Sequence, residues 1–340
     1  MSKIFLTGGS GYIGGQVLQE LASTRPDFHI TVLVRDPEKA GLIRSSFPHI
    51  KTVIGDLDDS NLMEHQASQA SIILNLASTN HISSVHAIHK GLKMKRDVAD
   101  SYWIQISGAS ALAVDELAAP NFVPGSSSSR IFDDASGLAA MKAMIKAYPS
   151  RAVDNYMFGV AAEKMIKTAI VFPPIIYGVG QGPVNHRSIQ IPSLAQATLQ
   201  RGRGLRVGQG LNRWGNIHIG DMGRIFSSLA LKADSRDNNE ATWGDEGLYL
   251  AGVGELTFGD VSRRIAEYAH SSRLISSSEV DELDKATSDK ILPHGSVLFG
   301  TNARSNASKA RDFLGWEPRE HSLEEEIPNT VMEESRKATS

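Results

Sequence analysis

Three glycines near the N-terminus constrain the fold of this chain more than any other feature. Gly8, Gly11 and Gly14 recur at three-residue spacing in TGGSGYIG, between the β-type run KIFL and an apparent helix. In such a loop the first glycine permits a tight turn, the second lets the backbone approach a pyrophosphate, and the third lets the helix pack against the strand. Free N–H groups at the helix start would face the phosphates. The motif, which includes Tyr12 and Ile13, predicts dinucleotide binding.

The first half of the chain alternates short apolar, β-rich runs with longer mixed segments. This alternation is typical of βαβ units, which build a parallel sheet buried on both faces. The expected strands are residues 3–6, 29–34, 51–54, 71–76, 102–107 and 167–172. The sequence therefore predicts an α/β fold with a doubly wound parallel sheet, a Rossmann fold, whose ligand lies at the carboxyl ends of the strands.

Glycine and proline cluster between residues 173 and 183, and after this cluster helical stretches alternate with isolated short strands. We expect a dinucleotide-binding Rossmann domain over residues 1–174 and a smaller, mainly substrate-binding C-terminal lobe over residues 175–340. Residues 216–228 and 248–251 could return to the Rossmann domain. The segment PGSSSS, residues 124–129, is either a surface linker or a flap over the site.

The second expected strand ends at an arginine, which bears on the choice of cofactor. Arg35 stands where a guanidinium can pair with the 2'-phosphate of NADP(H), and an acidic residue there would favour NAD. NADP(H) is favoured, although Asp36 one residue later would reverse the argument if the strand ended there. Four residues after the third and fourth strands are expected near adenine and its ribose: Asp56, Leu57, Ala77 and Ser78. Asp56 could instead cap a helix.

Composition narrows the range of partners. The chain is 41% hydrophobic and 21% charged, as in an ordinary globular protein, and its net charge of -3 is spread without blocks of like charge. Nucleic acid and membranes are therefore not expected as partners. Cysteine is absent, and three nearby histidines (His81, His86 and His89) lack a further converging ligand, so no metal site is expected. We expect a cytoplasmic monomer or homodimer that binds a small-molecule substrate.

The chain resembles the extended short-chain dehydrogenase/reductase family of nucleotide-sugar epimerases and dihydroflavonol-type reductases. The similarity spans nearly the whole chain and rests on TGGSGYIGG, VRDP, GDLDD, PPIIYGVG, NIHIGD and ARDFLGWEPR in this order. Typical members place a serine or threonine after the fifth strand and a Tyr-x-x-x-Lys helix beside it for proton transfer. No tyrosine of this chain has lysine four places on. It is most similar to atypical members, common in fungi, that lack this signature.

Several residues could replace the missing pair. Ser110 in QISGASAL is the best-placed hydroxyl, although the family's usual offset falls at Ala109. Tyr156 is the tyrosine of the helix expected before the sixth strand, whose other polar candidates are Arg151, Asp154 and Asn155. Tyr177 and His218 follow later strands and could supply an acid, or could support loops.

Three residues of the second lobe could serve substrate binding or structure. Arg187 would suit an anionic substrate, or could face solvent, and Trp214 could stack on a planar one. Asp221 is expected to cap the helix that it begins.

Three functions remain open from the sequence. The first is an NADP(H)-dependent oxidoreductase that acts on a small carbonyl or alcohol. The second is a non-redox isomerase, dehydratase or cyclase on the same fold, suggested by the loss of Tyr-x-x-x-Lys. The third is a non-catalytic regulator that senses a dinucleotide. The substrate itself depends on loops of the second lobe and does not follow from the sequence.

Overall fold

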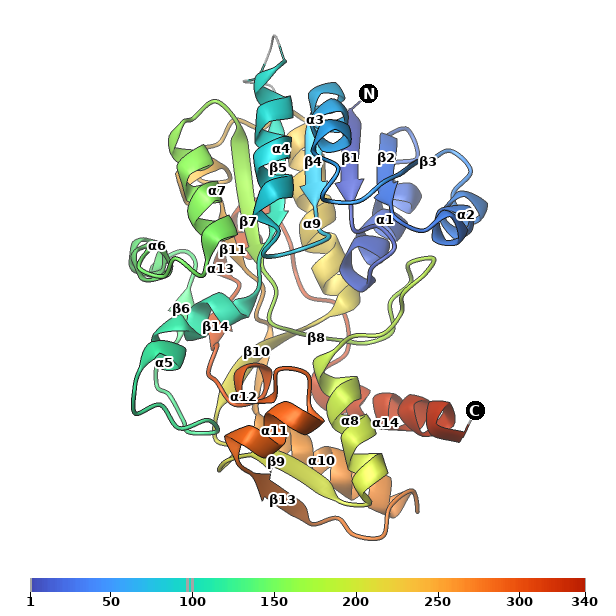
Figure 1. Cartoon of the computed structure of the whole chain (residues 1–340), viewed down its shortest axis with the longest axis vertical. Helices are drawn as coiled ribbons and strands as arrows, with labels where there is room; N and C mark the ends of the chain where they lie inside the picture. Colours follow the sequence, from blue (N-terminus) through green and yellow to red (C-terminus); the bar gives the residue numbers. More distant parts are fainter. Residues whose placement is uncertain (1, 96–97, 99–100, 340) are drawn as a thin grey trace.

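The computed structural model describes residues 2–95, 98 and 101–339, arranged as a larger lobe above a smaller one (Figure 1). The larger lobe is built on a seven-stranded parallel sheet in the order β11-β7-β5-β4-β1-β2-β3. Its strands are β1 (Lys3–Thr7), β2 (His29–Val34), β3 (Lys51–Ile54), β4 (Ile72–Asn75), β5 (Tyr102–Ile106), β7 (Lys167–Phe172) and β11 (Leu248–Leu250). The predicted doubly wound α/β fold is confirmed.

Helices cover both faces of this sheet. One face carries α1 (Tyr12–Thr24), α2 (Pro37–Ser46) and α9 (Ile219–Asp234), and the other carries α3 (Ser60–Gln69), α4 (Ile82–Lys93) and α7 (Ala152–Ala162). Successive side chains of a strand point to opposite faces. Ile4 and Leu6 therefore join the core under α1, while Phe5 joins the core under α4. Burial on both faces explains why the strands read as continuous apolar runs.

The smaller lobe holds short sheets surrounded by helices. Its pairings are β12-β10-β8, β13-β9 and β14-β6. The strands are β6 (Phe132–Asp133), β8 (Ile175–Tyr177), β9 (Gly204–Val207), β10 (Arg213–His218), β12 (Gly254–Thr257), β13 (Val280–Leu283) and β14 (Ser305–Asn306). The remaining helices are α5 (Val114–Ala118), α6 (Leu138–Lys146), α8 (Gln190–Arg201), α10 (Phe258–Ser271), α11 (Lys285–Ile291), α12 (Gly295–Leu298), α13 (Ser308–Leu314) and α14 (Leu323–Thr339).

The chain crosses between the lobes more than once. Residues 216–228 leave β10 in the smaller lobe and enter α9, which packs beside α1 on the large sheet. Residues 248–251 contain β11, which pairs with β7 at the edge of that sheet. The segment 124–129 is fastened to the smaller lobe, because Asn302 donates to Ser126 O at 2.9 Å and Arg304 donates to Ser128 O at 3.0 Å.

A buried polar chain holds the carboxyl ends of three strands together. The Thr7 hydroxyl donates to Asn75 Oδ1 at 2.6 Å, and the Asn75 amide donates to Gln105 Oε1 at 2.8 Å. Each of these side chains is at most 1% exposed. Because buried polar groups are costly unless they are paired, this chain favours one alignment of β1, β4 and β5 at the edge that faces the smaller lobe.

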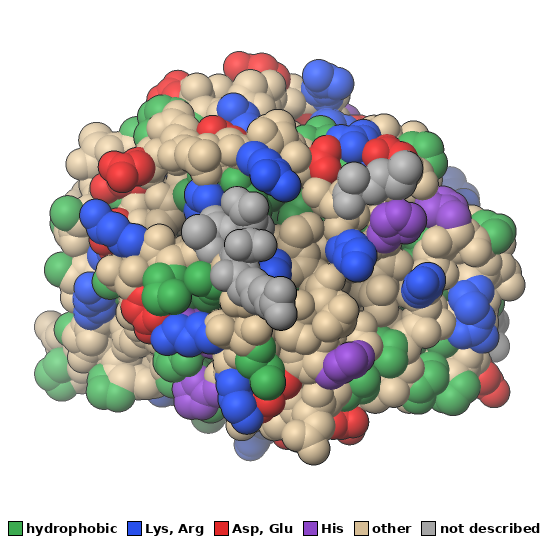
Figure 2. Space-filling view, turned by 90° about the horizontal axis from the view of Figure 1, so that it is seen from above, with side chains coloured by type: hydrophobic (Ala, Val, Ile, Leu, Met, Phe, Trp, Pro, Cys, Tyr) green, Lys and Arg blue, Asp and Glu red, His purple; other side chains and the backbone are tan. Residues whose placement is uncertain are grey.

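The opposite edge of the sheet carries the amino ends of the strands. Figure 2 looks onto this end, where lysine, arginine and histidine side chains are interspersed with acidic and uncharged ones. Every helix within the described residues is too short or too polar to span a bilayer.

Candidate functional site

The glycine loop connects β1 to α1 in a turn that side chains would block. Gly8 has φ +79°, and a Cβ added to it would lie 2.7 Å from the Ala77 nitrogen. A Cβ on Gly14 would lie 2.2 Å from the Gly8 carbonyl oxygen. Gly11 caps α1 without a side-chain hydrogen bond, so the N–H groups of the first turn receive no side-chain cap from it. A helix start of this kind attracts phosphate.

Two hollows meet at this loop, and both are lined by Gly8, Gly11 and Ala77. The outer hollow has a volume of about 490 Å³. It is lined by Gly8, Ser10, Gly11, Leu33, Arg35, Lys39, Asp56, Leu57, Asp58, Ala77, Ser78 and His81. The inner hollow, of about 480 Å³, extends from the loop to the smaller lobe. Besides Gly8, Gly11 and Ala77 it is lined by Tyr12, Ile13, Gly14, Leu76, Thr79, Gly108, Ala109, Ser110, Pro173, Pro174, Ile176, Asn185, Arg187, Ser188, Ile189, Gln190, Trp214 and Leu298.

The structure brings together all ten residues predicted to bind the cofactor. Tyr12, Ile13 and Gly14 line the inner hollow, and the other seven line the outer hollow or both. The Tyr12 hydroxyl donates to Gly178 O at 2.7 Å, which ties the loop to the chain after β8. Two hollows joined at a phosphate-type loop fit the two halves of a dinucleotide, with the pyrophosphate between them.

The side chains of the outer hollow bear on the choice between NADP(H) and NAD. Arg35 and Lys39 line it. Asp36 does not: its carboxylate caps α2 by accepting the Glu38 N–H at 2.9 Å, and lies 3.9 Å from the Lys39 amine. The acidic residue that would favour a free ribose hydroxyl is therefore engaged elsewhere, whereas the arginine faces the hollow.

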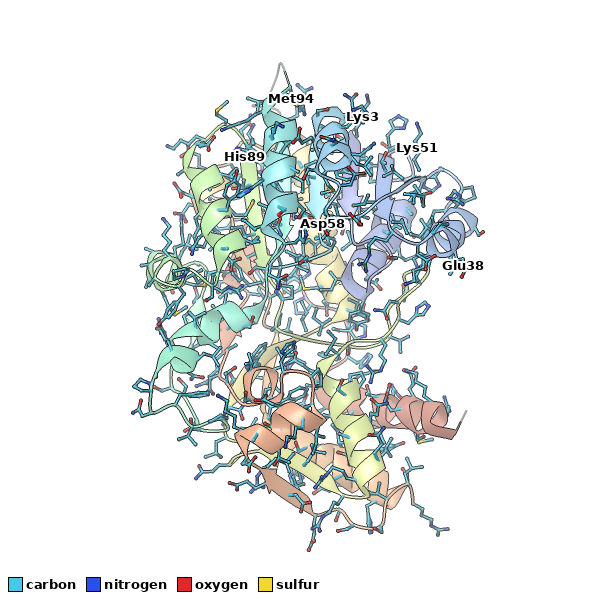
Figure 3. The ribbon with its side chains drawn as sticks, viewed as in Figure 1. Lys3, Glu38, Lys51, Asp58, His89 and Met94 are labelled. Carbon is cyan, nitrogen blue, oxygen red and sulfur yellow. The ribbon has the colours of Figure 1, made fainter. Side chains whose placement is uncertain are left out.

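Asp56 lines the outer hollow and shapes the turn after β3. One of its carboxylate oxygens accepts the N–H groups of Asp58 at 2.9 Å and Asp59 at 3.1 Å. The helix cap of α3 is Asp59, whose side chain accepts the Leu62 N–H. Figure 3 shows the neighbouring Asp58 toward the carboxyl ends of the strands, far from Lys3 and Lys51 at the amino ends.

Ser110 is the one predicted catalytic residue that lines a hollow. It lies in a 3-10 helix, Ala109–Ala113, that begins shortly after β5. Arg151, just before α7, donates to Ser107 Oγ at 3.0 Å and to Ser110 Oγ at 3.5 Å. Asp154, 1% exposed, holds the same guanidinium through bonds of 2.7 and 2.6 Å. The sequence marked Arg151 and Asp154 as polar residues of this helix but gave no sign that they meet these serines.

Tyr156 lies between α4 and α7, away from both hollows. Its hydroxyl is 2.7 Å from His89 Nδ1, and its ring centroid is 4.5 Å from that of His86. Burial raises the pKa of Tyr156 and lowers the pKa of His89. Figure 3 shows His89 between these helices, far from the strand ends that face the smaller lobe. The arrangement is that of packed, hydrogen-bonded side chains joining two helices.

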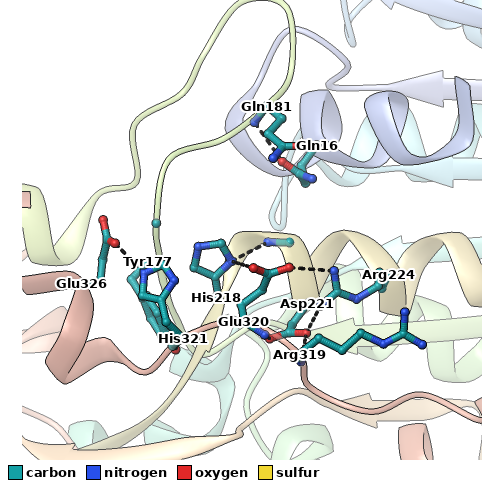
Figure 4. Close-up of polar contacts among 12 residues, drawn as sticks. Gln16, Tyr177, Gln181, His218, Asp221, Arg224, Arg319, Glu320, His321 and Glu326 are labelled. Carbon is teal, nitrogen blue, oxygen red and sulfur yellow. Dashed lines mark hydrogen bonds and ion pairs between the residues drawn. The ribbon is translucent and has the colours of Figure 1, made fainter. Parts of the chain in front are cut away.

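Tyr177 and His218 pack together at the junction of the lobes but line neither hollow (Figure 4). The Tyr177 hydroxyl donates to His321 O at 2.8 Å, and burial raises its pKa. His218 caps α9, because its Nδ1 accepts the Gly220 N–H at 3.1 Å, and burial lowers its pKa. Both side chains thus have structural partners.

The cap of α9 differs from the prediction. Asp221 begins the helix in the sequence, yet its buried carboxylate accepts the backbone N–H groups of Arg319 at 2.8 Å and Glu320 at 3.2 Å. It therefore fastens the segment before α14 to α9, and His218 takes the capping position three residues earlier.

Among the described residues, one cluster of three side chains has the residue types and spacing of metal ligands. Ligand atoms of His218, Glu320 and His321 lie within 4.8 Å of one another. Other groups already bind them: Arg224 donates to Glu320 at 2.9 Å, and Glu326 lies 2.6 Å from His321 Nε2 (Figure 4). The cluster therefore joins α9 to the C-terminal segment.

The chain is similar to known proteins over most of its length. Residues 8–115 match a family described as NAD(P)H-binding. The chain is 32% identical over 343 residues to the oxidase ucsJ of an Acremonium species, covering 98% of each protein. It is 24% identical to the uncharacterized protein YLL056C of Saccharomyces cerevisiae, covering 96% of this chain and 97% of the yeast protein.

Solved structures show the same fold at low identity. The dTDP-glucose 4,6-dehydratase of Bacillus anthracis in complex with NAD superimposes with a TM-score of 0.65 and 15% identity, covering 98% and 96% of the two chains. The UDP-glucose 4-epimerase of Thermotoga maritima with UDP-glucose gives a TM-score of 0.63 and 17% identity, covering 99% and 100%. Together with the full-length relative and the glycine loop, these similarities show that the chain belongs to the extended short-chain dehydrogenase/reductase family, as an atypical member without Tyr-x-x-x-Lys.

Proposed function

We propose that this protein is an NADP(H)-dependent oxidoreductase that reduces or oxidises a small carbonyl or alcohol. The observation that carries the proposal is the pair of hollows joined at the glycine loop, one lined by Arg35 and Lys39 and the other by Ser110. Gly8, Gly11 and Gly14 would hold the pyrophosphate. Arg35 and Lys39 would hold the 2'-phosphate, because an arginine can bind a phosphate through two parallel hydrogen bonds.

The chemistry divides between the cofactor and the chain. When bound, NADP(H) supplies or accepts a hydride, and the protein supplies binding, orientation and electrostatics. Ser110 would donate a hydrogen bond to the reacting oxygen, in the region where typical family members place their serine or threonine. In reduction, solvent water would supply the proton that this oxygen takes up; in oxidation, water would accept it. A substrate seated against the apolar wall of the inner hollow would displace water from that wall, which strengthens the polar interactions at the reacting oxygen.

A second function is favoured by one observation. The chain lacks the Tyr-x-x-x-Lys pair, and similar folds include a dehydratase and an epimerase. A non-redox isomerase, dehydratase or cyclase would keep the same hollows and use the dinucleotide without net oxidation.

The two functions differ in whether NADPH is consumed. We expect a panel of uncharged ketones and aldehydes to include compounds that deplete the near-ultraviolet absorbance of NADPH, with product two hydrogens heavier by mass spectrometry. Ser110→Ala should slow this turnover by about 10²-fold while leaving the Kd for NADPH unchanged. A product of unchanged mass, formed equally with oxidised cofactor, would instead establish the non-redox function.

A further inference from the structure

We infer that the inner hollow receives an electroneutral, mainly apolar carbonyl compound whose single reacting oxygen is received by Ser110. The inference deepens the proposed function and rests on it for the identity of the reacting group. Four features of the inner hollow support this inference. They are the apolar wall away from the glycine loop, the hydrogen bonds of its polar side chains, the ion pair of Arg187 and the unpaired proton of Ser110.

The wall away from the glycine loop is largely apolar. It is formed by Pro173, Pro174, Ile176, Ile189, Trp214 and Leu298. Ile189 is 60% exposed, a large value for an isoleucine beside a hollow. Apolar surface that is left open at a concave site favours a ligand that covers it with apolar groups of its own.

Several polar groups of the same wall are already bonded within the protein. The Trp214 indole N–H donates to Thr301 O at 2.9 Å, so it is not available to a ligand. Gln190 donates its amide to Leu298 O at 2.7 Å. Asn185 Oδ1 accepts the Arg187 N–H at 3.0 Å. A ligand with many polar groups would therefore lose its bonds to water here and find few replacements.

The one charged residue in the lining, Arg187, is paired with a carboxylate outside the hollow. Arg187 binds Glu334 of α14 through two bonds of 2.9 and 3.0 Å, and the Glu334 side chain is only 3% exposed. Although burial acts to raise the pKa of Glu334, hydrogen bonds from Arg187 and Lys337 hold it below its usual value. Glu334 therefore stays ionised and competes with any anionic ligand for Arg187. This changes the expectation from the sequence that Arg187 would attract an anion.

The Ser110 proton is not engaged, as is also true of the Thr79 hydroxyl and the Asn185 amide N–H groups among the described lining residues. Its oxygen accepts from Arg151 at 3.5 Å, and a guanidinium has only donors. Arg151 thus cannot take the Ser110 proton, and no other hydrogen bond of that hydroxyl occurs among the described residues. The O–H is left to donate into the hollow, as a carbonyl oxygen requires. Asp154 holds Arg151 in place.

These features select one class of ligand. A neutral ketone or aldehyde with an apolar body uses the apolar wall and the hydroxyl of Ser110. A carboxylate or a nucleoside diphosphate would bring a charge that Arg187 is not free to balance.

The test measures binding rather than turnover. Protein saturated with NADP⁺ is titrated with 4-phenylbutan-2-one, with its carboxylate counterpart 4-phenylbutanoate and with UDP-glucose, by isothermal calorimetry. We expect the ketone to bind at least about tenfold more tightly than either anion. A carboxylate or UDP-glucose that binds as tightly as the ketone would overturn the inference.

Two substitutions at the ion pair sharpen this test. Glu334→Gln frees Arg187, so 4-phenylbutanoate should gain about tenfold in affinity while the ketone changes by less than about threefold. Glu324→Gln on the same helix removes an acid outside the lining and should change neither. If Glu334→Gln does not fold, Arg187→Met is used instead and should leave ketone affinity within about threefold of the wild type. If Arg187→Met lost ketone binding, Arg187 would be shown to contribute to that binding. This result would contradict its engagement by Glu334.

The outcomes separate this inference from the proposed function. NADPH binding is measured first by its own fluorescence. If NADPH binds and the ketone binds but is never reduced, the redox function fails and the ligand class stands. If NADPH binds and only anions bind in the inner hollow, the ligand class fails and the cofactor assignment stands.

Discussion

Arg151 and Asp154 form a buried ion pair beneath the carboxyl end of β5, with 2.6 Å between guanidinium and carboxylate. The Asp154 side chain is 1% exposed and that of Arg151 is 16% exposed. Burial raises the pKa of Asp154, and the guanidinium opposes that rise. The pair holds the Arg151 guanidinium against the hydroxyls of Ser107 and Ser110.

Removing one partner of this pair should be costly. Asp154→Ala leaves a guanidinium without its carboxylate, and we expect a loss of about 3 kcal/mol in the free energy of unfolding, measured with urea. The control is Glu267→Ala, whose pair with Arg263 on α10 is about half exposed on both sides. That change should cost less than about 1 kcal/mol. Equal costs would show that the buried pair adds nothing to stability.

Among the described residues, the hydrogen-bond partner of the Ser110 hydroxyl is the Arg151 guanidinium and not a tyrosine or histidine, which predicts a flat pH profile. A serine hydroxyl and a guanidinium keep their protonation states between about pH 6 and about pH 9. The kcat for NADPH-dependent reduction should therefore stay within about threefold across this range, measured by steady-state kinetics. A profile that falls tenfold with a single apparent pKa inside the range would point to a titrating acid such as a tyrosine or histidine.

The glycine loop can be tested against a glycine elsewhere in the chain. Gly14→Ala places a methyl group 2.2 Å from the Gly8 carbonyl oxygen, so the loop must shift. We expect it to cost about 1–3 kcal/mol and to weaken NADPH binding at least tenfold, by thermal unfolding and fluorescence titration. Gly41→Ala in α2 has nothing within 4 Å and should stabilise the helix by about 0.5–1 kcal/mol without changing binding. Unchanged NADPH affinity in Gly14→Ala would contradict the placement of the pyrophosphate.

The cap of α9 predicts a loss of stability in mild acid. Burial lowers the pKa of His218 below 6.5 in the folded protein, so the neutral form is favoured there. The stability that it contributes is complete above the unfolded pKa and is lost as the pH falls through the folded value. Relative to His218→Asn, which keeps a capping group, the wild type should lose stability between about pH 7.5 and about pH 5. A difference in unfolding free energy that stays constant with pH would contradict this role.

Local patterns in the sequence were enough to predict the large sheet. The bounds of β2, β3 and β7 coincide with the predicted ranges, because buried parallel strands read as continuous apolar runs between turns. The glycine loop is equally local, since its three glycines act on each other and on adjacent backbone.

The inner hollow depends on contacts between distant residues, which no local pattern records. Arg187 looks like a free cation in the sequence, but its partner Glu334 lies 147 residues further on. Arg151 meets Ser107 across 44 residues because the fold places the start of α7 beside the end of β5. The position of Asp221 at the start of a helix predicted a helix cap. In the structure its buried carboxylate instead accepts backbone N–H groups 98 and 99 residues away.

The most direct test of the account is a comparison of NADPH and NADH affinity. Fluorescence titrations of both cofactors against wild type and Arg35→Ser isolate the 2'-phosphate contact. We predict that NADPH binds the wild type at least about tenfold more tightly than NADH, and that Arg35→Ser removes most of this preference without weakening NADH. Equal affinity of the wild type for the two cofactors, or an equal loss of both on substitution, would contradict the assignment of the outer hollow to NADP(H).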